Sequence, residues 1–194
     1  RLDSTNVIEN PLASIITPIQ RDHEHFLGSE LTQIAGEKAG IIKKNVPVIS
    51  ASQTNEVGET LKNKAREMNA PIFFEGADFI WEHMSTGEIK LECKNRVFTL
   101  PPPSLIGPHQ IQNAALAAAS LIYSNNFTPM DDRLFSGIGF AKWPGRVQFI
   151  DKGKLLNYRG ERPIWIDGAH NSHSATALAA SLAKAKRKVL LIDI

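Results

Sequence analysis

Apolar runs and helical patterns alternate along the first part of the chain. Residues 13–19 (ASIITPI) form a run rich in branched side chains, which predicts a buried strand. Apolar residues spaced three and four apart predict a helix over residues 31–42, and the run 46–51 (VPVISA) predicts a second strand. A helix over 54–69 and a strand over 71–75 follow. This alternation predicts a parallel sheet with helices on its faces.

The pattern changes after residue 77. Segments 78–84, 89–94 and 96–100 are typical of short strands joined by tight turns, which predicts a small antiparallel β excursion. Prolines 101–103 end this excursion, because consecutive prolines cannot join a β-ladder and favour an extended connector.

Two helices are expected next, and then a boundary. Residues 109–123 (HQIQNAALAAASLIY) carry five alanines and form the most helical stretch, and residues 130–136 are a further helix candidate. Residues 143–146 (WPGR) place Pro and Gly between two periodic regions. We therefore expect one domain over residues 1–144 and another that begins at the joint and covers residues 145–194.

The second region has the pattern of an opening βαβ unit. Residues 147–150 are expected to pair with 155–158 as a hairpin, and 163–167 (PIWID) form a further strand. A helix over 175–184 and a buried strand over 189–194 complete the pattern. The predicted fold class is α/β: a parallel sheet flanked by helices, a small antiparallel excursion and the start of a second, Rossmann-like α/β domain.

Composition narrows the function classes. The 194 residues are 42% hydrophobic and 22% charged, which is typical of a globular protein. Lys and Arg number 22 and Asp and Glu 20, for a net charge of +2, which argues against nucleic acid as the main partner. No apolar run approaches the roughly 20 residues of a membrane helix. The single cysteine, Cys93, makes a cytoplasmic location the expectation.

The ends of the sequence suggest a fragment. The chain begins with Arg1, and the expected strand at 189–194 stops without a turn or a following helix. An apolar strand normally requires a sheet around it. We expect the chain to be a piece of a longer protein.

Two groups of polar residues lie where parallel strands are expected to end, the position where α/β sheets bind ligands. His23 follows the first strand and Lys38 lies on the next helix, a placement suited to a metal or a phosphate. The alternative is that the neighbouring Asp22 caps a helix or turn and that Lys38 is a solvated surface lysine. Asp167 and His170 follow a later strand at the start of a helix, where backbone amides favour an anion; alternatively, Asn171 or Ser172 simply caps that helix.

Three further residues are candidates. Arg146 lies at the joint, where a guanidinium can reach a phosphate across a cleft. Asn113 lies on the alanine-rich helix, and its amide can hydrogen-bond an adenine edge or, alternatively, cap or pack. Asp3 precedes the first strand and on its own indicates only a polar loop.

Several segments, taken in order, resemble the folylpolyglutamate synthase and dihydrofolate synthase family, within the Mur-type ATP-dependent amide ligases. They cover nearly the whole chain, and the ordered set is far more specific than any one member. The segments are RLDSTNVI (1–8), IITPIQRDHEHFLG (15–28), IAGEKAGIIK (34–43), GPHQIQNAALAA (107–118), WPGR (143–146) and IDGAHN (166–171).

The resemblance implies an activity and its small-molecule partners. The family couples ATP hydrolysis to amide formation between a pteroate or folate carboxylate and the amino group of L-glutamate, through an acyl phosphate. It implies ATP and Mg²⁺ as cofactors and a monomeric protein without a nucleic-acid or membrane partner. His23 then matches a ligand of the divalent cation, and Lys38 matches a lysine that is carbamylated, which gives it a carboxylate-like group for Mg²⁺.

The resemblance also implies the nucleotide contacts. Asn113 matches the residue that contacts adenine, and Arg146 the phosphate-reaching arginine at the joint. Asp167 and His170 match nucleotide contacts of the second domain, and Asp3 matches an aspartate near the pterin site.

The sequence departs from the family's pattern in three respects: it lacks the phosphate loop, the acidic metal ligand that precedes the RLD segment, and most of the second domain. No G-x-x-x-x-G-K-[ST] segment occurs in it, whereas family members carry a related glycine-rich phosphate loop upstream of the matched region. Two alternatives therefore stay open: another Mur-type amino-acid ligase, and a non-catalytic remnant or nucleotide-binding module.

Overall fold

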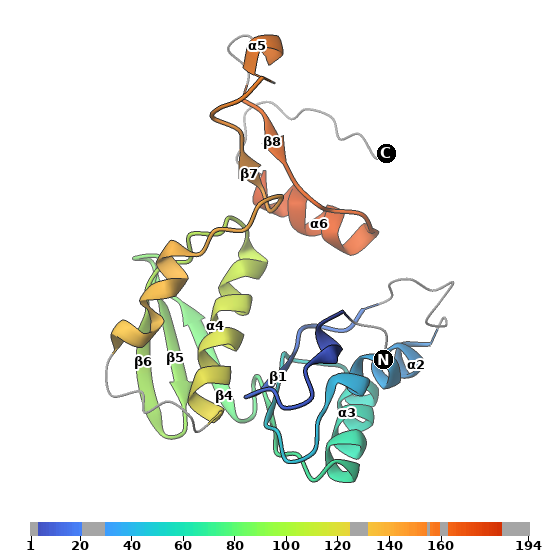
Figure 1. Ribbon diagram of the computed structural model, residues 1–194. Coiled ribbons are helices and arrows are strands. Elements are labelled where there is room, and N and C mark those ends of the chain that lie inside the picture. Colours follow the sequence, from blue (N-terminus) through green and yellow to red (C-terminus); the bar gives the residue numbers. More distant parts are fainter. Residues whose placement is uncertain (1–3, 21–29, 125–131, 155, 160–162, 184–194) are drawn as a thin grey trace.

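The computed structural model describes residues 4–20, 30–124, 132–154, 156–159 and 163–183 (Figure 1). A 3-10 turn, η1 (Ser4–Val7), opens the described part. The described chain then forms a parallel sheet, an antiparallel sheet and a small C-terminal unit, as the sequence pattern predicts.

The parallel sheet contains β1 (Ser14–Ile16), β2 (Val48–Ser50) and β3 (Ile72–Phe74) in that spatial order. Its register sets Ser14 beside Val48 and Val48 beside Ile72. Helix α2 (Leu31–Lys38), continued by the 3-10 turn η2 (Ala39–Ile41), and helix α3 (Asn55–Glu67) cover one face (Figure 1). The predicted strands and helices are confirmed, although the strands are shorter than their apolar runs.

The central strand β2 is buried on both faces because helices cover both. Val48 packs in the cluster between the sheet and helices α2 and α3, with Ile34 and Leu61. Ile49 points the other way, into the larger cluster around helix α4 (Pro108–Tyr123). A continuous apolar run is the expected sequence pattern of a strand covered on both sides.

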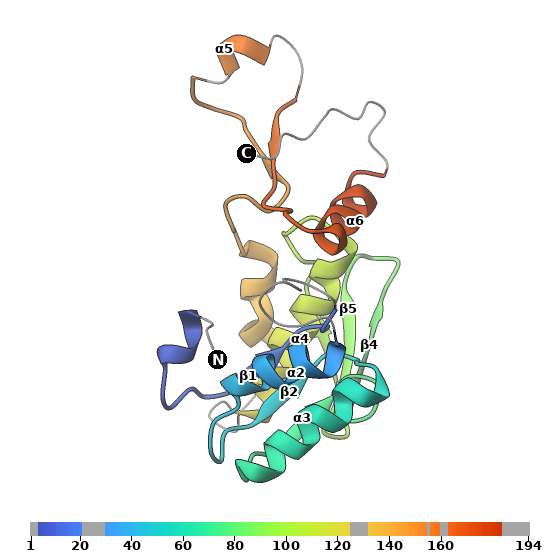
Figure 2. The same cartoon turned by 90° about the vertical axis from the view of Figure 1, so that its right-hand side faces the viewer.

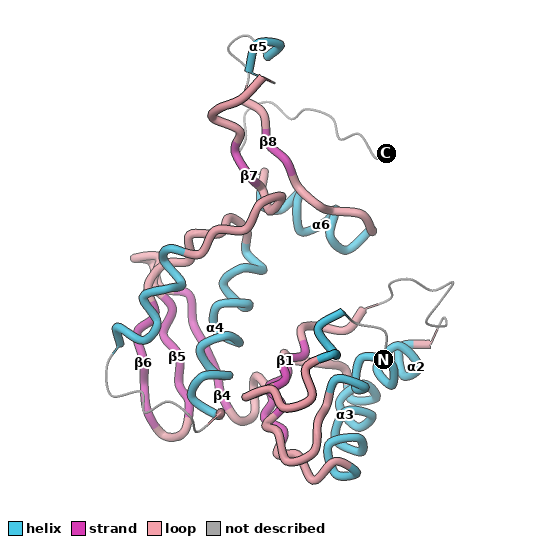
Figure 3. The backbone as a smooth tube through the Cα atoms, in the orientation of Figure 1, coloured by secondary structure: helices cyan, strands magenta, loops and turns pink. Residues whose placement is uncertain are grey.

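The antiparallel sheet contains β4 (Phe79–His83), β5 (Ile89–Cys93) and β6 (Arg96–Leu100). Alternate residues of β5 are buried, which matches the period of two of a sheet with one covered face. Helix α4 lies between this sheet and the parallel one (Figure 3). The 3-10 segment η3 (Asp132–Phe140) packs on β6 through the Phe135 and Phe98 rings. The shared α4 joins both sheets into one core.

The C-terminal unit contains β7 (Gln148–Phe149), α5 (Leu156–Arg159), β8 (Trp165–Ile166) and α6 (Ser172–Ser181) (Figure 2). The hairpin expected between residues 147–150 and 155–158 is wrong. Strand β7 pairs antiparallel with β8, and residues 156–159 form a helical turn instead. The Phe149 and Trp165 rings, 5.0 Å apart between centroids, form a cross-strand aromatic pair that favours this pairing.

Helix α6 starts three residues before the expected position. The Asn171 side chain accepts a hydrogen bond from the Ser174 N–H at 2.8 Å and closes a capping box, so the capping role considered for Asn171 is confirmed. The strand expected at 189–194 lies outside the described residues.

Candidate functional site

Glu75 is a hydrogen-bond hub at the carboxyl end of β3. Its Oε2 accepts the backbone N–H of Ser52 at 2.9 Å and the Nε2 of Gln112 at 2.7 Å. Its Oε1 accepts the indole N–H of Trp81 at 2.7 Å. The half-buried carboxylate thereby joins the loop after β2, helix α4 and strand β4.

Gln53 likewise connects separate segments by hydrogen bonds, at the ends of β1 and β2. Its Oε1 accepts the Ile19 N–H at 3.0 Å, and its Nε2 donates to the carbonyl of Thr17 at 3.1 Å and to the Ser50 Oγ at 3.2 Å. Neither Gln53 nor Glu75 was predicted from the sequence as a functional residue. Each follows a parallel strand closely, and that placement is the signal that would have found them.

The predicted adenine contact, Asn113, lies in the second turn of α4. Its half-buried amide donates to the Gln110 Oε1 at 3.1 Å, and the Gln110 amide lies 2.9 Å from the His109 ring. Helix α4 begins after Gly107, whose φ of 130° suits glycine. A Cβ on Gly107 would lie 2.6 Å from the Ser181 Oγ, so α4 begins directly beside α6.

The joint brings three predicted residues together. Asp167 follows β8, and its two carboxylate oxygens accept the N–H groups of Val147 and Ala169, each at 2.8 Å. The Gly168 N–H donates to the Gly145 carbonyl at 2.8 Å, and Arg146 Nη1 lies 3.8 Å from where a Cβ on Gly168 would be. Arg146 and Asp167 therefore belong to one structural unit, and His170, whose Nδ1 lies 2.9 Å from the Gly168 carbonyl oxygen, joins them.

Lys38 ends helix α2 and is exposed. His23 and Asp3, the other predicted metal and pterin residues, lie outside the described residues. Within the described ranges, no group of three His, Cys, Asp or Glu side chains could hold a metal ion. The described residues alone thus do not make a Mg²⁺ site, and the predicted metal set stays a prediction.

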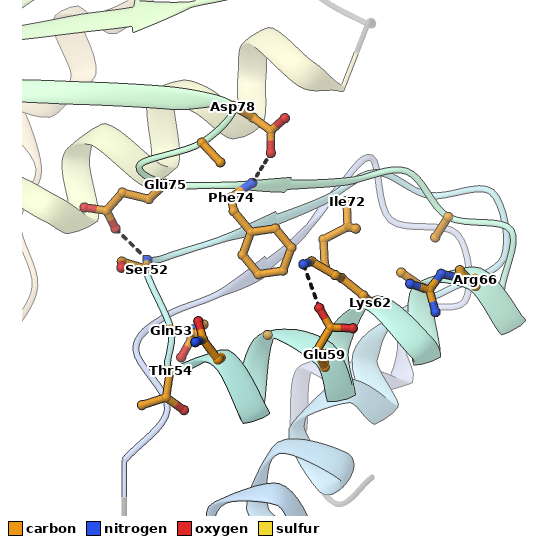
Figure 4. A pocket seen from close by; sticks show the side chains of 15 residues that line it. Ser52, Gln53, Thr54, Glu59, Lys62, Arg66, Ile72, Phe74, Glu75 and Asp78 are labelled. Atoms are coloured by element: carbon orange, nitrogen blue, oxygen red, sulfur yellow. Dashed lines mark hydrogen bonds and ion pairs between the residues drawn. The ribbon is translucent and has the colours of Figure 1, made fainter.

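A cavity of about 510 Å³ lies between α3 and the edge of β3 (Figure 4). Lys62 reaches across it, 2.8 Å from Glu59 Oε1 and 5.7 Å from the centre of the Phe74 ring. The hydrogen bond from Lys62 lowers the pKa of the exposed Glu59. The cavity shares Gln53 and Glu75 with the carboxyl edge of the sheet but contains none of the predicted site residues.

Known proteins resemble this chain along nearly its whole length. The dihydrofolate synthase/folylpolyglutamate synthase of Bacillus subtilis is 36% identical over 189 residues, which cover 94% of this chain and 42% of that protein. A probable dihydrofolate synthetase of Schizosaccharomyces pombe is 38% identical over 97% of this chain and 44% of its own length. No family model matches the chain.

Solved structures agree with these relatives. Mycobacterium tuberculosis folylpolyglutamate synthase complexed with ADP superposes with a TM-score of 0.76 and 31% identity, over 93% of this chain and 40% of that one. An FPGS-AMPPCP-folate complex superposes with a TM-score of 0.72 and 27% identity, over 94% and 44% of the two chains.

The chain spans less than half the length of these relatives. Within that span the similarity runs from the parallel sheet through the joint to α6, and it includes the α/β architecture described above. Over nearly its whole length, the chain is therefore homologous to part of the folylpolyglutamate and dihydrofolate synthases.

Proposed function

We propose that the chain acts as part of an ATP-dependent, ADP-forming amide ligase of folate metabolism. The ligase joins L-glutamate to dihydropteroate, to tetrahydrofolate, or to both, through an acyl phosphate. The observation that carries this proposal is the similarity to dihydrofolate and folylpolyglutamate synthases over nearly the whole chain, which includes the joint where the candidate nucleotide residues lie.

We assign the nucleotide-binding site to the first two turns of α4 and to the joint. Asn113 contacts adenine, Arg146 reaches the phosphates, and Asp167 and His170 complete the second side of the site. Two observations support this assignment: α4 begins beside α6, and the Arg146 side chain is exposed at the joint. A guanidinium binds phosphate oxygens through two parallel N–H donors, which fixes the geometry as well as the charge.

Magnesium is assigned to His23 and a carbamylated Lys38, with Asp3 near the pterin. The position of Lys38 on the helix that follows β1, at the exposed end of α2, supports its part in the assignment. When bound, Mg²⁺ would neutralise charge that develops on the transferring phosphoryl group. Arg146 adds charge stabilisation from the joint, and closure of two domains would exclude water that hydrolyses an acyl phosphate.

We also propose the organisation of the protein. Residues 1–144 form the latter part of the ATPase domain, and residues 145–194 form the joint and the start of the C-terminal domain. The protein works as a monomer in the cytoplasm on small molecules, without nucleic acid or membrane as a partner. In the described residues no helix is long and apolar enough to cross a bilayer.

The test is a substrate panel on the purified protein with Mg-ATP and L-glutamate. We expect ADP release that requires both glutamate and either dihydropteroate or tetrahydrofolate, and a product heavier by one glutamyl residue in mass spectrometry. Omission of the pteroate is the control. Tight Mg-ATP binding without product on either acceptor would favour a nucleotide-binding module, and product only on a cell-wall precursor would favour another Mur-type ligase.

A further inference from the structure

The joint contains a strained backbone. Val147 has a φ of 43°, in the left-handed region where a β-branched residue is a genuine outlier. Its side chain is buried, with 4% of its surface exposed. Such a conformation persists only where the surrounding structure holds it, and it is concentrated at functional sites.

Asp167 stabilises this conformation of Val147 through a hydrogen bond. Its Oδ2 accepts the Val147 N–H at 2.8 Å, while its Oδ1 accepts the Ala169 N–H at the same distance. Twenty residues separate Asp167 from Val147, so this carboxylate connects the end of β8 to the chain that enters β7. Both carboxylate oxygens are therefore used by backbone groups of the joint.

Two more hydrogen bonds stabilise the same part of the joint. The Gly168 N–H donates to the Gly145 carbonyl at 2.8 Å, and the Gly145 N–H donates to the Gln148 Oε1 at 2.9 Å. Gly145 has a φ of 74°. The residue between these two left-handed positions is Arg146.

Arg146 lies between these two residues, and its side chain extends from the joint into solvent. Its side chain is exposed, and among the described residues it has no hydrogen-bond or ion-pair partner. The backbone of a residue sets the direction of its Cα–Cβ bond, and therefore the region that a long side chain can reach. The backbone of Arg146 is set by a glycine on one side and a strained valine, fixed by Asp167, on the other.

We propose that Asp167 is a positioning residue that acts through Arg146: it holds Val147 in the left-handed region and so aims the guanidinium at the nucleotide phosphates. This inference rests on the proposed function and revises one part of it, because Asp167 is assigned to hold the backbone at Val147 rather than to contact the nucleotide. Misplacement of a charged group by about 1 Å costs up to about a hundredfold in rate.

The first experiment tests the geometry without activity. Asp167→Asn keeps one oxygen acceptor and replaces the other by an amide that cannot accept. We expect hydrogen exchange of the Val147 or Ala169 amide to become at least about tenfold faster in the variant. Asp151→Asn, an exposed aspartate in the same unit, is the matched control and should change neither amide. Unchanged exchange in Asp167→Asn would overturn the proposal.

The second experiment is a double-mutant cycle in the ligase reaction. We expect Asp167→Asn to lower kcat about tenfold to a hundredfold, and to have little further effect once Arg146→Ala is present. Independent, multiplicative losses would mean that Asp167 contacts the nucleotide itself, which would overturn the proposal. A wild-type protein without ligase activity would instead refute the proposed function, while the exchange result would still decide the geometry.

A rescue variant separates positioning from a general loss of structure. Glycine adopts a φ of 43° without steric cost, so Val147→Gly should restore part of the kcat lost in Asp167→Asn. Val147→Gly alone measures the cost of removing the buried side chain. The absence of any rescue, at equal melting temperature, would count against an action of Asp167 through the backbone.

Discussion

Single residues at the ends of strands organise the described part of this molecule. Glu75 is the clearest example, because one carboxylate accepts from three elements that are far apart in the sequence. A hydrogen bond to a half-buried carboxylate stabilises the folded state more than one to a neutral acceptor. If the carboxylate is removed, each donor must bind water or remain without a hydrogen bond.

Glu75→Ala should destabilise the protein by about 2 kcal/mol, since it deprives the Ser52 N–H, Gln112 and the Trp81 indole of their acceptor. Urea unfolding followed by tryptophan fluorescence measures the change. Glu67→Ala removes an exposed ion pair with Lys64 and is the control, with an expected cost below about 0.5 kcal/mol. Equal costs for the two variants would show that Glu75 is not a hub.

Cys93 provides a test of pH dependence. Burial raises the pKa of its thiol, so the folded state favours the protonated form. An acid whose pKa is raised on folding contributes stability below its unfolded pKa, about 8.5 for a thiol, and loses it as the pH rises further. We expect wild-type stability to fall relative to Cys93→Ala between about pH 8 and pH 10.

Thiol labelling gives an independent check on Cys93. As the only cysteine, it should react with a disulfide reagent at pH 8 at least about tenfold more slowly in the folded protein than in urea. Fast labelling of the folded protein, or parallel stability curves for the wild type and Cys93→Ala, would contradict the buried, protonated thiol.

At the scale of elements, local sequence patterns predicted most of the strands and helices. They did not predict which strand β7 pairs with. Strands β1 to β6 and helices α2 to α4 each carry their own period, and all were expected within a few residues. Strand β7 was paired wrongly because its partner depends on the contact between Phe149 and Trp165, which no local pattern contains. The position of Glu75 directly after β3 was a usable local signal, but its three hydrogen-bond donors come from distant segments and could not be predicted.

Helix α6 owes its start to one side chain. Asn171→Ala removes the acceptor for the Ser174 N–H and half of the capping box, so we expect a loss of about 1 kcal/mol and faster exchange of the Ser174 amide. Asn171→Asp, which keeps the acceptor, should restore both. The control is Asn157→Ala on α5, an exposed position. No change in Ser174 exchange would remove Asn171 as the cap.

At the scale of the whole molecule, one helix connects the parts. Helix α4 packs on both sheets, and its first turn lies beside α6 of the C-terminal unit. The order of the matched segments predicted the family, because six short motifs in sequence constrain a fold far more than any periodicity. The sequence did not predict that Asp167 would be bonded to the backbone, because that requires the loop geometry around Val147.

The contact at Gly107 has a consequence for natural variation. A methyl group there would lie 2.6 Å from both the His109 ring and the Ser181 hydroxyl, on a backbone with a φ of 130°. Every replacement of this glycine adds at least a Cβ atom, so each one strains the backbone and forces the His109 ring and the Ser181 hydroxyl to move. We therefore expect few tolerated replacements at Gly107.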